Sequence, residues 1–226
     1  MVAILEKIEL FNVSCCGRCN LFHHGVVQDC LQKSDFKFIS GNLYGIIGEF
    51  GEGGAALSCG MTGNIECVEG KINIDGNDVT INDLIDISWY IGNDLYKYGT
   101  SGLFINRPKF NKKTIHEQIE YGVRRQLIDK DFTTIKEMFH ISDERVDRNI
   151  NYVSGERWKA SAAIGYSNGK KLFCYPWMNS NDIEHLKEQI AHTVKILIDE
   201  GNIIILPTTK AKNIQEIYAD GICVFL

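Results

Sequence analysis

The residues with the clearest chemical meaning form a glycine-rich stretch, Gly48-Glu49-Phe50-Gly51-Glu52-Gly53-Gly54-Ala55-Ala56. Its glycine spacing is that of a phosphate-binding loop, G-x-x-x-x-G-K-[ST]. In such a loop backbone N–H groups surround the phosphates, the lysine reaches the β/γ oxygens and the hydroxyl holds Mg²⁺. Gly54 stands at the lysine position and Ala55 at the Ser/Thr position. The stretch therefore keeps the backbone curl but lacks the cation and the metal ligand.

Two carboxylates and the flanking segments bear on how this loop is used. Glu49 and Glu52 lie within it and would repel a triphosphate. The apolar run 43–47 predicts a strand before the loop, and residues 54–61 predict a helix after it. Strand, glycine loop and helix follow in the order that phosphate binding requires. A tight strand-to-helix turn without a ligand is the alternative interpretation.

Further segments match a known family in order and spacing. They are Ile8-Glu9-Leu10-Phe11-Asn12-Val13-Ser14, the stretches 70–79 and 113–119, Val153-Ser154-Gly155-Glu156-Arg157, the apolar run 203–206 and the end of the chain, 219–226. With the glycine loop they resemble the nucleotide-binding subunit of ATP-binding cassette (ABC) transporters over nearly the whole chain. The resemblance implies an α/β, P-loop NTPase fold of the ABC ATPase type, with a mixed sheet core and an inserted helical subdomain. It implies one domain over 1–226, with the core at 1–97 and 155–226 and the helical subdomain at about 98–154.

The resemblance also implies which residues face a nucleotide. In the loop these are Gly48, Gly51, Gly53, Gly54, Ala55 and Ala56. The signature-like residues are Ser154, Gly155 and Glu156, and in dimers of the family the helix that starts here contacts the ATP held by the other subunit. We expect Ser154 to be the N-cap of this helix, with Glu156 in its first turn, close to the phosphate. A helix cap with no ligand is the alternative.

The departures from the family fall on the positions that perform its chemistry. Pro176 replaces the aspartate that orders Mg²⁺, Trp177 replaces the glutamate that polarises water, and Thr208 replaces the histidine that contacts the γ-phosphate. Neither proline nor tryptophan can ligate a metal or accept a proton. We therefore expect no catalytic residue, negligible hydrolysis by this chain alone and no favourable site for Mg²⁺. ATP is the other cofactor of the family, and the loop backbone is the part of the motif that remains to bind it.

These losses lead to three hypotheses for the function. The first is a subunit with a degenerate nucleotide site, a non-hydrolysing partner of a membrane permease or of an active sister ATPase, in a homodimer or heterodimer. The second is a weak ATP-binding ATPase that uses groups such as Asp182 or Asn93. The third is a homodimeric scaffold that binds no nucleotide. The first requires a partner, the second requires turnover, and the third requires neither.

Composition limits the partners. A chain of 226 residues with 44% hydrophobic residues can bury one sizeable α/β core. The formal charge of −5 argues against nucleic acid or an anionic membrane surface as a partner, because both need a basic patch. The sequence has no run of about 18 apolar residues, and residues 1–7 lack the order of a signal peptide. We expect a cytoplasmic chain with no direct membrane insertion, which reaches a membrane only through a permease.

A cysteine and histidine cluster suggests a metal site. Cys16 and Cys19 form a C-x-x-C pair, and His23 and Cys30 follow at short range. The spacing is incomplete for zinc, because a second ligand pair would have to come from adjacent histidines. The interpretation we favour places free thiols on a mobile loop between the first two strands, in a reducing compartment. The remaining cysteines fall in or beside apolar segments and are expected in the core.

Periodicity and turn residues predict the order of the elements. The expected strands lie near residues 4–13, 35–40, 43–47, 71–74, 86–91, 171–175, 203–206 and 222–226, with an Asp-Gly turn at 75–76. The expected helices lie near residues 54–61, 80–85, 114–128, 131–139, 143–148, 155–167 and 182–200.

Overall fold

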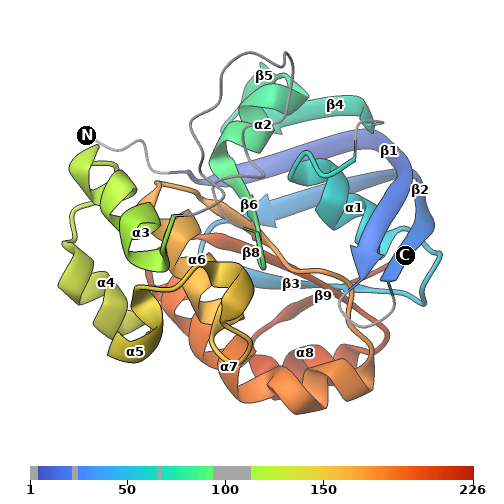
Figure 1. Ribbon diagram of the computed structural model, residues 1–226. Helices are drawn as coiled ribbons and strands as arrows, with labels where there is room; N and C mark the ends of the chain where they lie inside the picture. Colours follow the sequence, from blue (N-terminus) through green and yellow to red (C-terminus); the bar gives the residue numbers. More distant parts are fainter. Residues whose placement is uncertain (1–4, 22–24, 66–67, 94–112) are drawn as a thin grey trace. The chain divides into compact units, whose positions relative to one another are not determined.

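The structure is a computed structural model that describes residues 5–21, 25–65, 68–93 and 113–226. The chain divides into two compact units. Residues 91–170 form the helical unit, and residues 3–90 together with 171–226 form the sheet unit. Figure 1 shows the strands and the helices of both units. Each unit has its own buried core and is described by itself.

The sheet unit begins with a long antiparallel hairpin. β1 (Lys7–Leu21) pairs with β2 (Gly25–Ile39) from Lys7 opposite Ile39 to Leu21 opposite Gly25. The mobile loop expected between residues 13 and 35 is therefore wrong, because most of this segment is strand. The reason is that Val13, Cys15 and Cys19 are buried at alternating positions of β1, as in a half-buried strand.

Two further strands complete the antiparallel sheet. β4 (Val68–Ile74) and β5 (Asn77–Val79) give the order β2-β1-β4-β5 among the described strands. The expected Asp-Gly turn joins them and is confirmed: Asp75 and Gly76 have φ angles of 51° and 87°. Positive φ at both central residues is typical of a tight hairpin turn.

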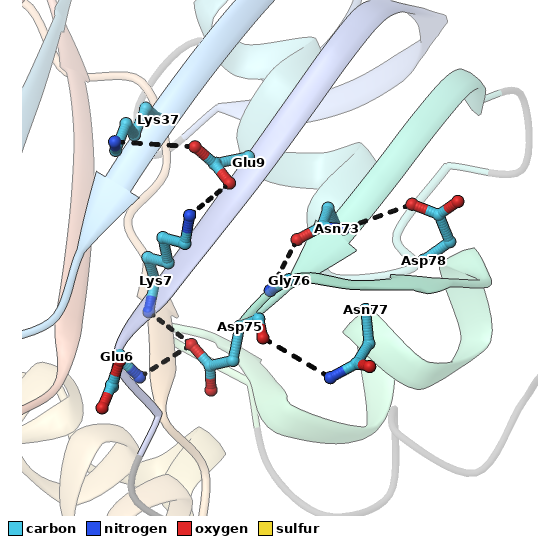
Figure 2. Close-up of polar contacts among 9 residues, drawn as sticks. All are labelled: Glu6, Lys7, Glu9, Lys37, Asn73, Asp75, Gly76, Asn77 and Asp78. Carbon is cyan, nitrogen blue, oxygen red and sulfur yellow. Dashed lines mark hydrogen bonds and ion pairs between the residues drawn. The ribbon is translucent and has the colours of Figure 1, made fainter.

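Figure 2 shows how this turn is fixed to the first strand. The Asp75 carboxylate accepts hydrogen bonds from the backbone N–H groups of Glu6 and Lys7, at 3.0 and 2.7 Å. The N–H of Gly76 donates to the side-chain oxygen of Asn73 at 2.8 Å. These bonds satisfy backbone donors at the sheet corner and hold β4 and β5 in register with β1.

The second sheet of this unit is parallel and carries the glycine loop. Its order among the described strands is β6-β7-β8-β3-β9. The bounds are Ser88–Tyr90 for β6, Leu172–Cys174 for β7, Ile203–Thr208 for β8, Asn42–Ile47 for β3 and Ile222–Phe225 for β9. The loop follows the carboxyl end of β3, the end at which α/β proteins place their ligands.

Helices cover both faces of the parallel sheet. α1 (Gly54–Met61) contacts β1 and β2 on one side and β8 on the other (Figure 1). All of its residues are buried. α7 (Ser180–Asp199) and α8 (Ala211–Ile217) pack on the opposite face. α2 (Ile81–Ile87) contacts α1, β4 and β6. The helix that carries the glycine loop is thus enclosed between two sheets.

The helical unit contains short helices packed around apolar side chains. Its described helices are α3 (Ile115–Arg124), α4 (Phe132–Met138), α5 (Asp143–Val146), the 3-10 helix η3 (Ile150–Tyr152) and α6 (Arg157–Ser167). Thr114 and Glu117 form a capping box at the start of α3, which satisfies two backbone donors. Ile115 and Ile119 on α3 are fully buried. None of the helices in the described part of the chain has the length and apolar character needed to span a bilayer.

Candidate functional site

The glycine loop turns from β3 into α1 through residues that only glycine accommodates easily. Gly51 and Gly53 have φ angles of 97° and 104°, and Gly53 is the N-cap of α1. A Cβ at Gly53 would lie 2.4 Å from the Cα of Leu31 on β2. The first helical hydrogen bond runs from the N–H of Leu57 to the carbonyl of Gly53 at 2.9 Å. The N–H groups before Leu57 therefore need partners outside the helix.

Asp29 on β2 supplies such a partner. Its Oδ1 accepts a hydrogen bond from the N–H of Gly53 at 3.0 Å, and its Oδ2 accepts one from the N–H of Ala56 at 2.8 Å. The residue is only 2% exposed. Sequence reasoning missed Asp29, since an acidic residue in a segment interpreted as a loop carries no signal of its own.

Glu52 satisfies a second part of the loop. Its carboxylate accepts a hydrogen bond from the N–H of Glu49 at 2.7 Å, and Oε2 would lie 3.0 Å from a Cβ placed on Gly48. The two acidic residues that the sequence places in the loop therefore have different roles in this hydrogen bond. Glu52 binds backbone within the loop, and Glu49 contributes its own N–H to that bond.

Apolar side chains pack where the family carries its lysine. A Cβ added at Gly54 would lie 3.0 Å from Cβ of Pro207, and 3.7 Å from both Cδ1 of Trp177 and Cδ1 of Leu226. The Trp177 indole N–H donates to the carbonyl of Gly48 at 3.2 Å, and Phe50 meets the Trp177 ring edge-on at 5.7 Å between centroids. The space above the loop is therefore lined by aromatic and aliphatic groups.

Of the other two replaced positions, Thr208 is hydrogen-bonded to the loop. Thr208 is fully buried, and its backbone carbonyl accepts from the N–H of Gly48 at 3.1 Å. Its hydroxyl accepts from the side-chain amide of Asn213 at 2.8 Å. Pro176 is buried and directly precedes Trp177. The structure thus brings Trp177 and Thr208 together at Gly48.

The residues present do not fit Mg²⁺. Ala55 and Pro176, at the two positions that would bind the ion, offer no side-chain oxygen. In the described ranges no group of three or more His, Cys, Asp or Glu side chains is placed to hold a metal. Asp182, considered as an unconventional catalytic group, accepts from the N–H of Asn179 at 3.1 Å in the capping box of α7. Its carboxylate therefore has a structural role at a helix start.

The signature-like residues belong to the helical unit, and their cap differs from the expected one. α6 begins at Arg157 with Glu156 as its N-cap, so the expectation that Ser154 caps this helix is wrong. The Glu156 carboxylate accepts from the N–H and the hydroxyl of Ser142 at 3.1 and 3.2 Å and pairs with Arg145 at 3.4 Å. These bonds join the N-cap residue of α6 to the N-cap and to a residue of α5, and Glu156 makes no side-chain cap bond of its own. Ser154 and Gly155 are exposed.

Two of the cysteines considered as metal ligands are paired with each other. Cys16 and Cys30 face each other across β1 and β2 and are joined by a disulfide, so the expectation of free thiols is wrong for this pair. Cys19 is buried, and a hydrogen bond with Cys59, burial and the nearby charges of Cys59 and Asp29 raise the pKa of its thiol. His23 lies outside the described residues.

A parallel sheet whose strand leads through a glycine loop into a buried helix defines an α/β fold of the P-loop NTPase type. Comparison with solved structures narrows this to the fold of ABC transporter ATP-binding proteins. The α/β fold expected from the sequence is thus confirmed. No family model matches the chain, and no curated protein matches its sequence.

Three of the solved structures illustrate the likeness. An ABC transporter ATP-binding protein from Pyrococcus furiosus has a TM-score of 0.60 at 12% identity, covering 97% of each chain. A dimeric bacterial ABC transporter cassette has a TM-score of 0.60 at 14% identity, covering 97% of this chain and 94% of that one. A bacterial ABC exporter with ATP bound has a TM-score of 0.59 at 17% identity, and its match covers all of this chain and 38% of the exporter. At these identities the likeness establishes the fold alone.

Proposed function

We propose that this chain is an ABC transporter ATP-binding-protein-like subunit with a degenerate nucleotide site. It acts as a non-hydrolysing partner of a membrane permease or of an active ATPase subunit. The observation that carries the proposal is the packing at Gly54, where Pro207, Trp177 and Leu226 lie within 3.7 Å of a Cβ that the family's lysine would place there.

The physical argument concerns charge. Phosphoryl transfer depends on a cationic side chain, Mg²⁺ and a group that orients water, all aimed at the phosphates. At this loop the corresponding positions carry Gly54, Ala55, Pro176 and Trp177. The indole of Trp177 is a donor with no acceptor atom, and its N–H is already used by Gly48. No group among these four can neutralise a phosphate or accept a proton from water.

The partner and the location extend this proposal. One of the neighbours is a dimeric transporter cassette and another is an exporter, in which the cassette is part of a longer chain. We place the present chain in a homodimer or heterodimer at the cytoplasmic side of a permease. We further propose that residues 1–226 act as one ABC-ATPase-like domain, with the core at 1–97 and 155–226 and the helical subdomain at about 98–154. Ser154 and Gly155 would face the partner's nucleotide.

The direct test measures phosphate release from ATP and Mg²⁺ by the purified chain, beside Trp177→Glu as a matched variant. Both proteins are expected to release phosphate at the background rate, because a carboxylate at position 177 does not replace the missing lysine and metal ligand. Magnesium-dependent release by the wild type would contradict the proposal and would favour the weak ATPase.

A second experiment identifies the assembly. Cross-linking of the tagged full chain in its own cells, followed by mass spectrometry, is expected to recover a membrane-spanning permease or an ATPase with an intact lysine-containing loop. Recovery of cross-links only between copies of this chain would instead support the nucleotide-free homodimeric scaffold.

A further inference from the structure

We propose that Asp29 is the built-in anionic ligand of the glycine loop, and that its carboxylate occupies the backbone N–H site at which a phosphate-binding loop receives oxyanions. The inference deepens the proposed function and rests on it, because it names what the degenerate loop binds in place of a nucleotide.

The first step is the geometry of the two hydrogen bonds. The two oxygens of Asp29 are shared between Gly53, the N-cap of α1, and Ala56, in the first turn of that helix. The distances, 3.0 and 2.8 Å, are those of well-formed bonds to a carboxylate. A phosphate at a helix start is bound in the same manner, by first-turn N–H groups that have no partner within the helix. One side chain from β2 therefore bridges the donors that a phosphate would use.

The second step is burial. Asp29 is buried, with an exposed fraction of 2%. An anionic side chain is tolerated inside a protein when it is hydrogen-bonded and lies near positive charge, and the start of α1 supplies both. Leu31, two residues further along β2, packs its Cα against Gly53, where a Cβ would lie at 2.4 Å. β2 therefore packs directly against the loop at Gly53, and this packing fixes the position of the Asp29 carboxylate beside the loop.

The third step compares the charge of the Asp29 carboxylate with the cationic groups that the loop lacks. A triphosphate needs a lysine and Mg²⁺ to offset its several negative charges, and the loop offers Gly54 and Ala55 instead. A single carboxylate needs neither, because N–H groups and the helix dipole are sufficient for one negative charge. The loss of the cationic groups and the presence of Asp29 are therefore consistent with each other. Removal of the carboxylate should leave an empty site for a small oxyanion such as phosphate or acetate.

The test is chemical rescue of Asp29→Ala, with thermal unfolding measured in chloride, acetate and inorganic phosphate at equal ionic strength. The matched control is Asp35→Ala, which removes another carboxylate of β2 that accepts a backbone N–H, that of Asn12, away from the loop. We expect Asp29→Ala to unfold about 5 °C or more below the wild type, since it loses two bonds to a charged acceptor. Phosphate or acetate should recover part of this loss, and the recovery should exceed the general stabilisation that the same ions give the wild type and Asp35→Ala.

An unchanged unfolding temperature for Asp29→Ala, or a recovery that chloride produces equally, would overturn the inference. If Asp29→Ala does not fold, Asp29→Asn decides, because it keeps the size of the side chain and loses the charge. The amide proton of Gly53 or Ala56 should then move upfield in an NMR spectrum, and unchanged amides at both positions would also overturn the inference. ATP turnover by the wild type would contradict the proposed function without altering the rescue result. Absence of rescue would overturn the inference and would leave the proposed function standing.

Discussion

At the scale of single residues, carboxylates hold the backbone of the loop, whereas side chains that fill space surround its lysine position, Gly54. Trp177 donates to the carbonyl of Gly48, and Pro207 lies against Gly54. These contacts are compatible with a rigid turn, and they oppose the entry of a long cationic side chain. We therefore expect that restoring lysine at position 54 and serine at position 55 does not restore ATP binding.

The double variant Gly54→Lys/Ala55→Ser tests this point. We expect it to bind no more ATP than the wild type and to lose about 1–3 kcal/mol of unfolding free energy, because a Cβ at position 54 would press on Pro207 at 3.0 Å. Calorimetry with ATP and Mg²⁺, together with urea unfolding, measures both effects. Micromolar binding by the double variant would mean that the apolar lining moves aside.

Gly53 and Gly51 form a matched pair that separates steric contact from backbone strain. Both have positive φ, at 104° and 97°, but a Cβ at Gly53 would lie 2.4 Å from the backbone of Leu31, whereas one at Gly51 would meet nothing within 4 Å. Gly51→Ala should cost about 1–3 kcal/mol from strain alone. Gly53→Ala should cost clearly more, because β2 would have to move away from the loop. Equal losses in urea unfolding would argue against the close packing of β2 on the loop.

At the scale of elements, a close helix crossing organises the helical unit. α3 approaches α6 at Gly122, where an added Cβ would lie 2.1 Å from the carbonyl oxygen of Ser167. The side-chain amide of Asn168 donates to the carbonyl of Gln118 at 3.2 Å beside this crossing. Because the obstacle is backbone, it cannot be relieved by a change of rotamer.

Gly122→Ala should therefore weaken the helical unit strongly. We expect a loss at or above the upper end of about 1–3 kcal/mol, the usual cost of overpacking, partly offset by the better helix propensity of alanine. The control is Gly155→Ala in the same unit, where a Cβ would meet only the flexible guanidinium of Arg145 at 3.1 Å. Urea unfolding followed by circular dichroism compares the two variants. A loss for Gly155→Ala as large as that for Gly122→Ala would contradict the crossing geometry.

Elements with strong local signals could be predicted from the sequence. α1 was expected at 54–61 and is found there, and α3 begins where Thr114 and Glu117 form their capping box. The hairpin of β1 and β2 was missed between residues 13 and 35, because cysteine, glycine and histidine resemble loop composition and the pairing is long-range. α8 was also missed, since its N-cap, Lys210, makes no side-chain cap.

The candidate site could be predicted only in part, for the same physical reason. The position of the loop and its lost side chains are local features and can be found in the sequence. Asp29 lies 24 residues before Gly53 in the sequence. Its hydrogen bonds to the loop depend on the register of the β1–β2 hairpin, which local sequence patterns did not reveal. The bonds of Glu156 to Ser142 likewise depend on how α5 and α6 pack.

At the scale of the whole molecule, ion pairs and caps on the surface set the pH range of stability. Carboxyls in both units have folded-state pKa values below their ordinary range. A hydrogen bond from Lys71 lowers the pKa of Asp78, one from Thr80 lowers that of Asp83, and one from Thr134 lowers that of Asp131. A lowered folded pKa adds stability above the unfolded pKa, and this stability is lost as the pH falls through the folded value.

We therefore expect a plateau of unfolding temperature from about pH 5 to about pH 9, with a decline on both sides. The acid decline follows from these carboxyls. The alkaline decline follows from groups whose folded pKa is raised, because burial raises the pKa of the Cys174 thiol and the hydrogen bond with Asp199 raises that of Lys195. The stability from such groups is lost as the pH rises from the unfolded pKa through the raised value. Thermal unfolding from about pH 3 to pH 11 measures the profile. Thr80→Ala should flatten the acid limb slightly, and an unfolding temperature that rises toward pH 3 would contradict the assignment.

The position of Trp177 also has an optical consequence. The sequence contains three tryptophans, and this one lies against the loop through Gly48 and Phe50. Trp177 is 6% exposed, so its fluorescence emission should respond to water if the loop separates from it. A difference spectrum against Trp177→Phe isolates this signal from the other two indoles. Trp177 is therefore an intrinsic fluorophore at the glycine loop, and its emission reports opening of the loop in real time without an added label.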